Sequence, residues 1–124
     1  MGILILFAML FCHIVDDYYL QGWLANGKQK SWWEKNAPSA KYKKDYLMAL
    51  FMHAFSWSFM VHIPLIIFSG ASGWIIGASI VINCIIHAVV DDQKANRGTI
   101  NLIQDQSIHM IQLAITFILF AWVF

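Results

Sequence analysis

The sequence predicts an all-α integral membrane protein, a four-helix bundle that forms a single domain over residues 1–124. Of the 124 residues, 60% are hydrophobic and only 12% are charged, whereas an ordinary soluble domain carries about 25% charged residues. Four apolar runs also reach the roughly 20 residues that a membrane-spanning helix needs. Helices satisfy their own backbone hydrogen bonds, as the hydrocarbon interior of a bilayer requires.

The expected helices follow the four apolar runs in order, at residues 2–22, 46–69, 74–93 and 102–124. No basic residue precedes the first run and no small-residue cleavage pattern follows it, so we expect a mature helix rather than a secretory signal. Polar loops connect these helices on one side, at 24–45 and 94–101. In the third helix, Gly73 and Gly77 form a GxxxG pair that predicts close packing against another helix.

The basic residues predict the orientation of the bundle. All eight Lys and Arg residues fall in the two polar loops, and therefore on one side. By the positive-inside rule that side is cytoplasmic, so both termini face outward. The chain is thus expected to be a multi-pass protein of a bacterial inner membrane, in contact with the lipid bilayer. Its net charge of +1 gives no indication of a nucleic acid partner.

Histidine and aspartate recur four residues apart in three of the four helices. The pairs are His13 with Asp17, His87 with Asp91, and, in reverse order, Asp105 with His109. Residues at this spacing lie on one helix face, a single turn apart. Because the fourth helix runs opposite to the first and third, the reversed order places carboxylates nearer the cytoplasm and imidazoles deeper in all three. His53, about two turns into the second helix, reaches the same depth.

Seven polar side chains are therefore expected to meet in one pocket near the cytoplasmic side. A charged group inside a bilayer costs at least about 2.5–3.5 kcal/mol on insertion scales, so the cluster needs compensation. A divalent metal would neutralise the carboxylates and bind the imidazoles; zinc is preferred, and manganese or iron also suit these ligands. The expected ligands are His13, Asp17, His53, His87, Asp91, Asp105 and His109. A structural hydrogen-bond network and a proton or ion pathway are the alternatives.

A metal with an open position lowers the pKa of its bound water toward about 7 and supplies a nucleophile. The sequence thus favours a metal-dependent hydrolase for a lipid, another amphiphile or a small phosphorylated molecule. One of Asp17, Asp91 and Asp105 would serve as general base, and Lys94 is a candidate for binding an anionic group. Lys28 is expected to contact lipid headgroups instead. A transporter or channel for metal ions or protons, and a non-enzymatic interaction protein, are the alternatives, so enzyme status stays open.

Several neighbouring residues are expected to have structural roles. Asp16 and Asp92 lie about 100° around the helix from Asp17 and Asp91, which favours helix capping or pairing with basic residues. If a helix unwinds at its tip, each of these residues would exchange roles with its neighbour, and that alternative stays open. His62 is out of phase with His53 and is expected to be structural. The recurring H-x-x-x-D motif is compatible with two helical hairpins related by a pseudo-two-fold axis. Because four helices form a small bundle, a homo-oligomer is also compatible with the sequence.

Four motifs together resemble a family of uncharacterised bacterial and phage membrane proteins, domain-of-unknown-function 3307. They are HIVDDYYLQG (13–22), MHA (52–54), HAVVDDQK (87–94) and DQSIH (105–109). The resemblance covers almost the whole chain and implies no activity. Many members carry a second histidine four residues after the one in the second helix, where this chain has Trp57. The architecture is also similar to intramembrane zinc hydrolases such as alkaline ceramidases and adiponectin-receptor-like proteins.

Overall fold

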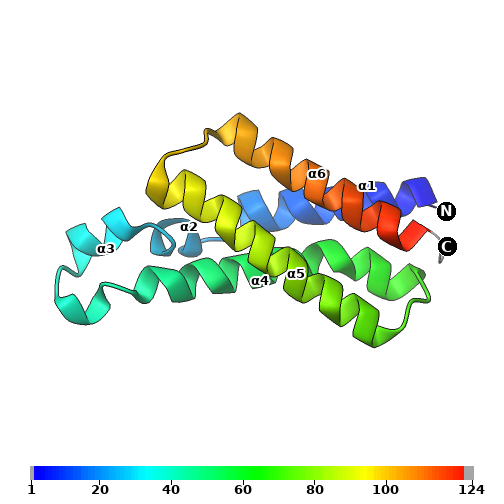
Figure 1. The fold of residues 1–124 in the computed structure, drawn as a ribbon, viewed down its shortest axis with the longest axis horizontal. Coiled ribbons are helices and arrows are strands. Elements are labelled where there is room, and N and C mark those ends of the chain that lie inside the picture. The colour runs from blue at the N-terminus through cyan, green and yellow to red at the C-terminus, as the bar shows by residue number, and fades with distance from the viewer. Residues whose placement is uncertain (1, 122–124) are drawn as a thin grey trace.

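The computed structural model describes residues 2–121, and these residues form helices and no strand. The four long elements are α1 (Gly2–Ile14) with its π-helical extension η1 (Val15–Leu20), α4 (Asp45–Phe68), α5 (Gly73–Asp92) with its π-helical extension η3 (Gln93–Arg97), and α6 (Leu102–Phe120). All four are long and apolar enough to cross a membrane, which confirms the predicted architecture (Figure 1). Met1 and residues 122–124, which include the expected end of the fourth helix, lie outside the described residues.

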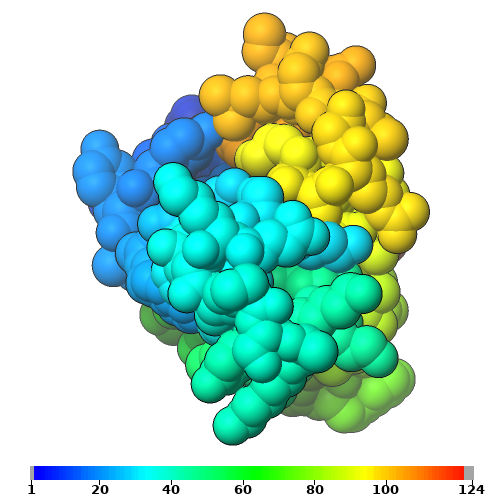
Figure 2. All heavy atoms as spheres, turned by 90° about the vertical axis from the view of Figure 1, so that its left-hand side faces the viewer, coloured from blue at the N-terminus to red at the C-terminus, as the bar shows by residue number. Residues whose placement is uncertain are grey.

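The first connection contains more structure than the expected polar loop. It forms α2 (Leu24–Gly27), α3 (Lys30–Asn36) and a 3-10 turn, η2 (Ala40–Tyr42). The physical reason is aromatic packing: the rings of Trp23, Trp32 and Trp33 meet edge to face, with centroids 5.0–5.8 Å apart. Figure 2 looks onto the end of the bundle formed by residues 21–45 and 93–101, here called the lysine-rich end, where this segment lies across the centre.

The interior of the bundle is divided along its length. Its apolar core fills the half away from the lysine-rich end, around Trp57, Val61 and Leu65 of α4, which are at most 1% exposed. The core is completed by Ile5, Met9, Ile76, Ile80, Leu113 and Phe120. Large apolar side chains also cover the outer faces of the helices, as contact with lipid requires. The buried aspartates and four of the five histidines gather in the other half, while a few polar side chains, such as His62 and Thr116, are buried within the apolar half.

Two predictions about individual residues have opposite outcomes. His62 is structural, as expected, because its Nδ1 donates to the Ser58 carbonyl at 2.7 Å and its Nε2 accepts from the Ser79 hydroxyl at 2.8 Å. The prediction for Gly73 and Gly77 is wrong within this chain. A Cβ added at either position would meet no atom within 4 Å, so neither glycine makes the close helix contact that its motif predicted.

Candidate metal centre

The structure brings the seven predicted side chains into one buried cluster. Four helical elements supply them: α1 with η1, α4, the last turns of α5 and the first turns of α6. Their exposed fractions are 0% for His53, His87, Asp105 and His109, 1% for Asp91, 2% for His13 and 6% for Asp17. Each H-x-x-x-D motif runs into a π-helical turn, a helix form that is frequent at functional sites.

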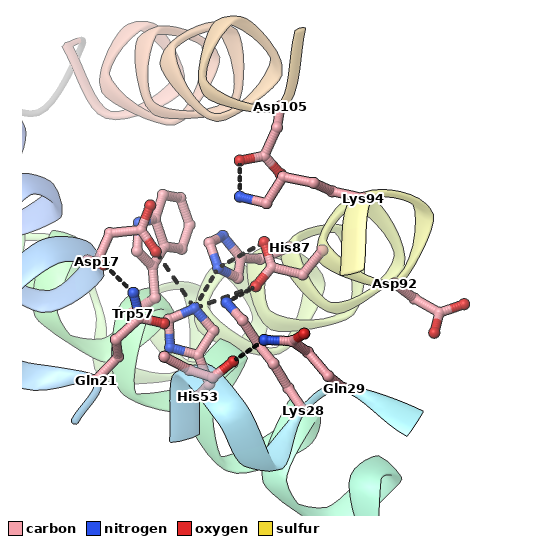
Figure 3. A network of polar contacts seen from close by, with 12 residues as sticks. Asp17, Gln21, Lys28, Gln29, His53, Trp57, His87, Asp92, Lys94 and Asp105 are labelled. Atoms are coloured by element: carbon pink, nitrogen blue, oxygen red, sulfur yellow. Dashed lines mark hydrogen bonds and ion pairs between the residues drawn. The ribbon is translucent and has the colours of Figure 1, made fainter. Parts of the chain in front are cut away.

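His53 lies at the centre of the cluster (Figure 3). Its Nε2 is 3.3 Å from Asp17 Oδ1, 3.2 Å from Asp91 Oδ2 and 3.2 Å from His87 Nε2. A ring nitrogen carries at most one proton, and carboxylates carry none when ionised. One N–H therefore cannot satisfy three neighbouring acceptors, and of these three only Asp91 Oδ2 has a lysine ammonium, that of Lys28, beside it.

The separations between these atoms match those of ligands around a small cation. Zinc bonds of about 2.0–2.1 Å in tetrahedral geometry place ligand atoms about 3.3–3.4 Å apart. Two groups of three residues meet the requirement of closeness, with ligand atoms within 4.8 Å of one another: Asp17, His53 and His87, and His87, Asp91 and His109. His87 is common to both groups and directs its Nε2 toward each. Because one nitrogen lone pair binds one ion, the groups describe alternative positions for a single metal.

Asp105 lies beside these groups rather than within them. Its Oδ1 is 3.5 Å from His109 Nε2 and, among the described residues, has no hydrogen-bond partner. Its Oδ2 is held by Lys94 Nζ at 2.5 Å and by the Gln106 amide at 3.0 Å. One carboxylate oxygen is thus fixed from the lysine-rich end while the other faces the cluster.

His13 has a different position from the other imidazoles, because both of its ring nitrogens are engaged. The Trp57 indole, which can only donate, bonds His13 Nδ1 at 2.7 Å. The ring proton must then be on Nε2, which donates to Gln106 Oε1 at 3.1 Å. This contact fixes the amide of Gln106 so that its nitrogen donates to Asp17 Oδ2 and Asp105 Oδ2, each at 3.0 Å.

These hydrogen bonds form a relay from Trp57 through His13 to Gln106. The relay itself lies outside the ligand groups, and it holds the carboxylates of Asp17 and Asp105 in place. Sequence reasoning did not assign Trp57 or Gln106 a role. A signal for both was present, since Trp57 follows His53 by four residues and Gln106 precedes His109 by three, on the same helix faces. The Trp57 ring also stacks on His87, with centroids 4.2 Å apart.

Replacing Gln106 by leucine is expected to weaken metal binding by about 10–100-fold, the usual effect of losing a group that orients a ligand. The change removes the amide that holds Asp17 and Asp105 and leaves His13 Nε2 without its acceptor. Competition titration against a chelator measures the affinity. Gln112→Leu on the same helix is the matched control, and equal affinities in the two variants would contradict the relay.

The position of Lys28 differs from the expectation that this residue contacts lipid headgroups. It is 6% exposed, and its Nζ reaches into the cluster to lie 2.6 Å from Asp91 Oδ2 (Figure 3). Gly27 lets the backbone approach closely, since a Cβ there would lie 2.7 Å from the Trp23 ring. The Asn96 amide of η3 also donates to the Lys28 carbonyl at 3.1 Å. The packed first connection, which the sequence did not predict, directs Lys28 inward.

The two adjacent aspartates differ from each other. Asp92 points away from the cluster and pairs with Arg97 at 2.9 Å, which confirms its expected pairing role. The prediction for Asp16, capping or pairing with a basic residue, is wrong: this residue is 1% exposed, accepts from the Ser56 hydroxyl at 2.6 Å and forms no ion pair within residues 2–121. The reason is the π-helical turn η1, whose wider winding turns both Asp16 and Asp17 toward the interior.

Comparison with known proteins identifies the family of the chain. Residues 5–124 match the family described as protein of unknown function DUF3307, and the chain belongs to it. No curated protein and no solved structure matches the chain.

Proposed function

We propose that this family member is a multi-pass inner-membrane hydrolase with both termini outside and a cytoplasm-facing centre for one divalent metal ion. Zinc suits the nitrogen-rich ligand set best, and manganese or iron would also accept its carboxylates. The orientation rests on the eight basic residues, all of which lie at the same end of the bundle as the cluster.

One observation carries the metal proposal. Three imidazole nitrogens and two carboxylates face one another at 3.2–3.7 Å, with too few protons to join them all. A cation among them would satisfy both groups of donors and offset the cost of burying charge in a membrane. The proposed ligands are His53, His87 and His109 with Asp17 or Asp91, while His13 positions them.

The same geometry supports hydrolysis. A bound divalent ion supplies a water of lowered pKa. Asp105 would accept its proton, because its Oδ1 faces the cluster 3.5 Å from His109 Nε2 with no hydrogen bond among the described residues, while Lys94 holds its Oδ2. The cluster lies within the spanning helices, so the favoured substrate is a lipid or another amphiphile. The interior beyond Trp57 counts against the transporter alternative, because its buried polar side chains, such as His62 and Thr116, are few and lie among apolar core residues.

Asp105→Asn tests the proposal, because it keeps the shape of the side chain and removes the base. We expect purified protein to contain a divalent metal in both forms by elemental mass spectrometry. Turnover of a panel of amphiphilic esters, amides and phosphoesters should fall about 100-fold or more in the variant, the usual minimum for loss of a general base. Wild-type protein without metal, or a variant of equal activity, would contradict it.

A further inference from the structure

A groove of about 850 Å³ lies between α5 and α6, in the part of the molecule that faces the bilayer. The two helices lie closest at the lysine-rich end and diverge toward the other end (Figure 1), and the groove is lined from the α4–α5 turn to Ile86 and Ile108. Its volume falls within the range of about 300–1,000 Å³ that is usual for small-molecule sites. Nearly all of its lining is apolar, with a few polar groups.

The walls of the groove distinguish between its two natural occupants, a helix and a hydrocarbon chain. Six isoleucines form much of them: Ile75, Ile82, Ile86, Ile108, Ile111 and Ile115. The small residues of the lining belong to the turn before α5 and to its first turns: they are Gly70, Ala71, Ser72, Ala78 and Ser79. The wall that α6 contributes contains no glycine, alanine or serine. Helices that pack together in membranes approach through small residues such as glycine, alanine and serine. Bulky branched walls hold two helices apart and suit a flexible chain, which enters from the bilayer without another protein.

Polar groups define the floor of the groove and its position relative to the cluster. The Gln112 amide donates to the carbonyl and side-chain oxygens of Asn83 at 2.8 and 2.9 Å, and Gln112 Oε1 is buried without a partner among the described residues. Asn83 precedes His87 by four residues and Gln112 follows His109 by three. The floor is therefore one helical turn, about 5 Å, from the stacked His87 and His109 rings.

We propose that this groove binds the hydrocarbon chain of a single long-chain amphiphile, with its polar end directed to the cluster. The idea rests on the proposed hydrolase for the identity of the amphiphile as substrate. Ile86 and Ile108 end the groove and directly precede His87 and His109 in the chain. A chain in the groove would thus bring its first polar group to within about one helical turn of the cluster, beside the Asn83 and Gln112 side chains.

A photoreactive palmitic acid with a diazirine near its methyl end tests the proposal in detergent-purified, metal-loaded protein. We expect saturable labelling on peptides of α5 and α6, competed by unlabelled palmitic acid. Ile82→Trp fills the groove and should abolish the saturable labelling. Ile85→Trp is the matched control, because Ile85 is on the same helix, is equally lipid-facing (59% against 57% exposed) and lies outside the groove.

Non-saturable labelling spread over all four helices would overturn the proposal, and so would equal labelling of the two tryptophan variants. A second copy of the chain that protects the groove from the reagent would overturn it as well. Metal content is measured on the same samples, so the two ideas fail separately. Saturable labelling of protein that binds no metal would support the hydrocarbon-chain site and contradict the proposed hydrolase. Metal binding without saturable labelling would contradict the hydrocarbon-chain site alone.

Discussion

His87→Ala is expected to abolish metal binding by the purified protein. His87 belongs to both groups of three donors, so its loss leaves neither group complete. Removing a group that only orients a ligand costs about 10–100-fold in affinity, and removing a shared ligand should cost more. Elemental mass spectrometry of protein purified in detergent should therefore find the metal of the wild type reduced to background.

The control for this experiment is His62→Ala, which removes another fully buried imidazole from outside the cluster. It should keep the metal while losing its bonds to Ser58 and Ser79. Because alanine at 87 also removes the ring between Trp57 and His109, Asp17→Asn provides a second variant that preserves shape. Metal retained by His87→Ala, or lost equally from His62→Ala, would leave the structural hydrogen-bond network as the better interpretation.

The sequence was sufficient for the helices and for the depth of the polar residues, because both follow from strong local rules. Length and hydropathy define a membrane span, and a spacing of four places His13 and Asp17 on one helix face. The reversed order of Asp105 and His109 then corresponds to the reversed direction of α6. These relations do not depend on the details of packing, so the cluster could be predicted from the sequence alone.

Contacts between distant segments could not be predicted in this way. Lys28 looked like a headgroup contact because its inward direction depends on tryptophan packing and on an asparagine 68 residues later in the chain. The prediction for Asp16 was wrong because a π-helical turn changes which residues face inward, whereas spacing rules assume a regular α-helix. The position of His13 depends on the donor-only chemistry of Trp57, which matters only once the two side chains are known to touch.

Lys28→Met is expected to destabilise the metal-free protein by about 3–5 kcal/mol, the usual cost of breaking a buried ion pair by removing one partner. The variant keeps most of the side-chain volume but leaves Asp91, whose side chain is 1% exposed, without its ammonium group. A divalent ion in the cluster would compensate the same carboxylate. The loss measured by denaturant unfolding should therefore be large without metal and small with it.

Two comparisons separate this charge effect from simple loss of packing. Arg97→Met removes the partner of Asp92 at an exposed pair, where the Arg97 side chain is 61% exposed, and should cost at most about 1 kcal/mol. The double variant Lys28→Met with Asp91→Asn removes both charges and should be more stable without metal than Lys28→Met alone. If the single variant lost the same stability with and without metal, the ion pair and the metal would not act on the same carboxylate. Asp91 would then be an ion-pair partner of Lys28 and no part of a metal centre.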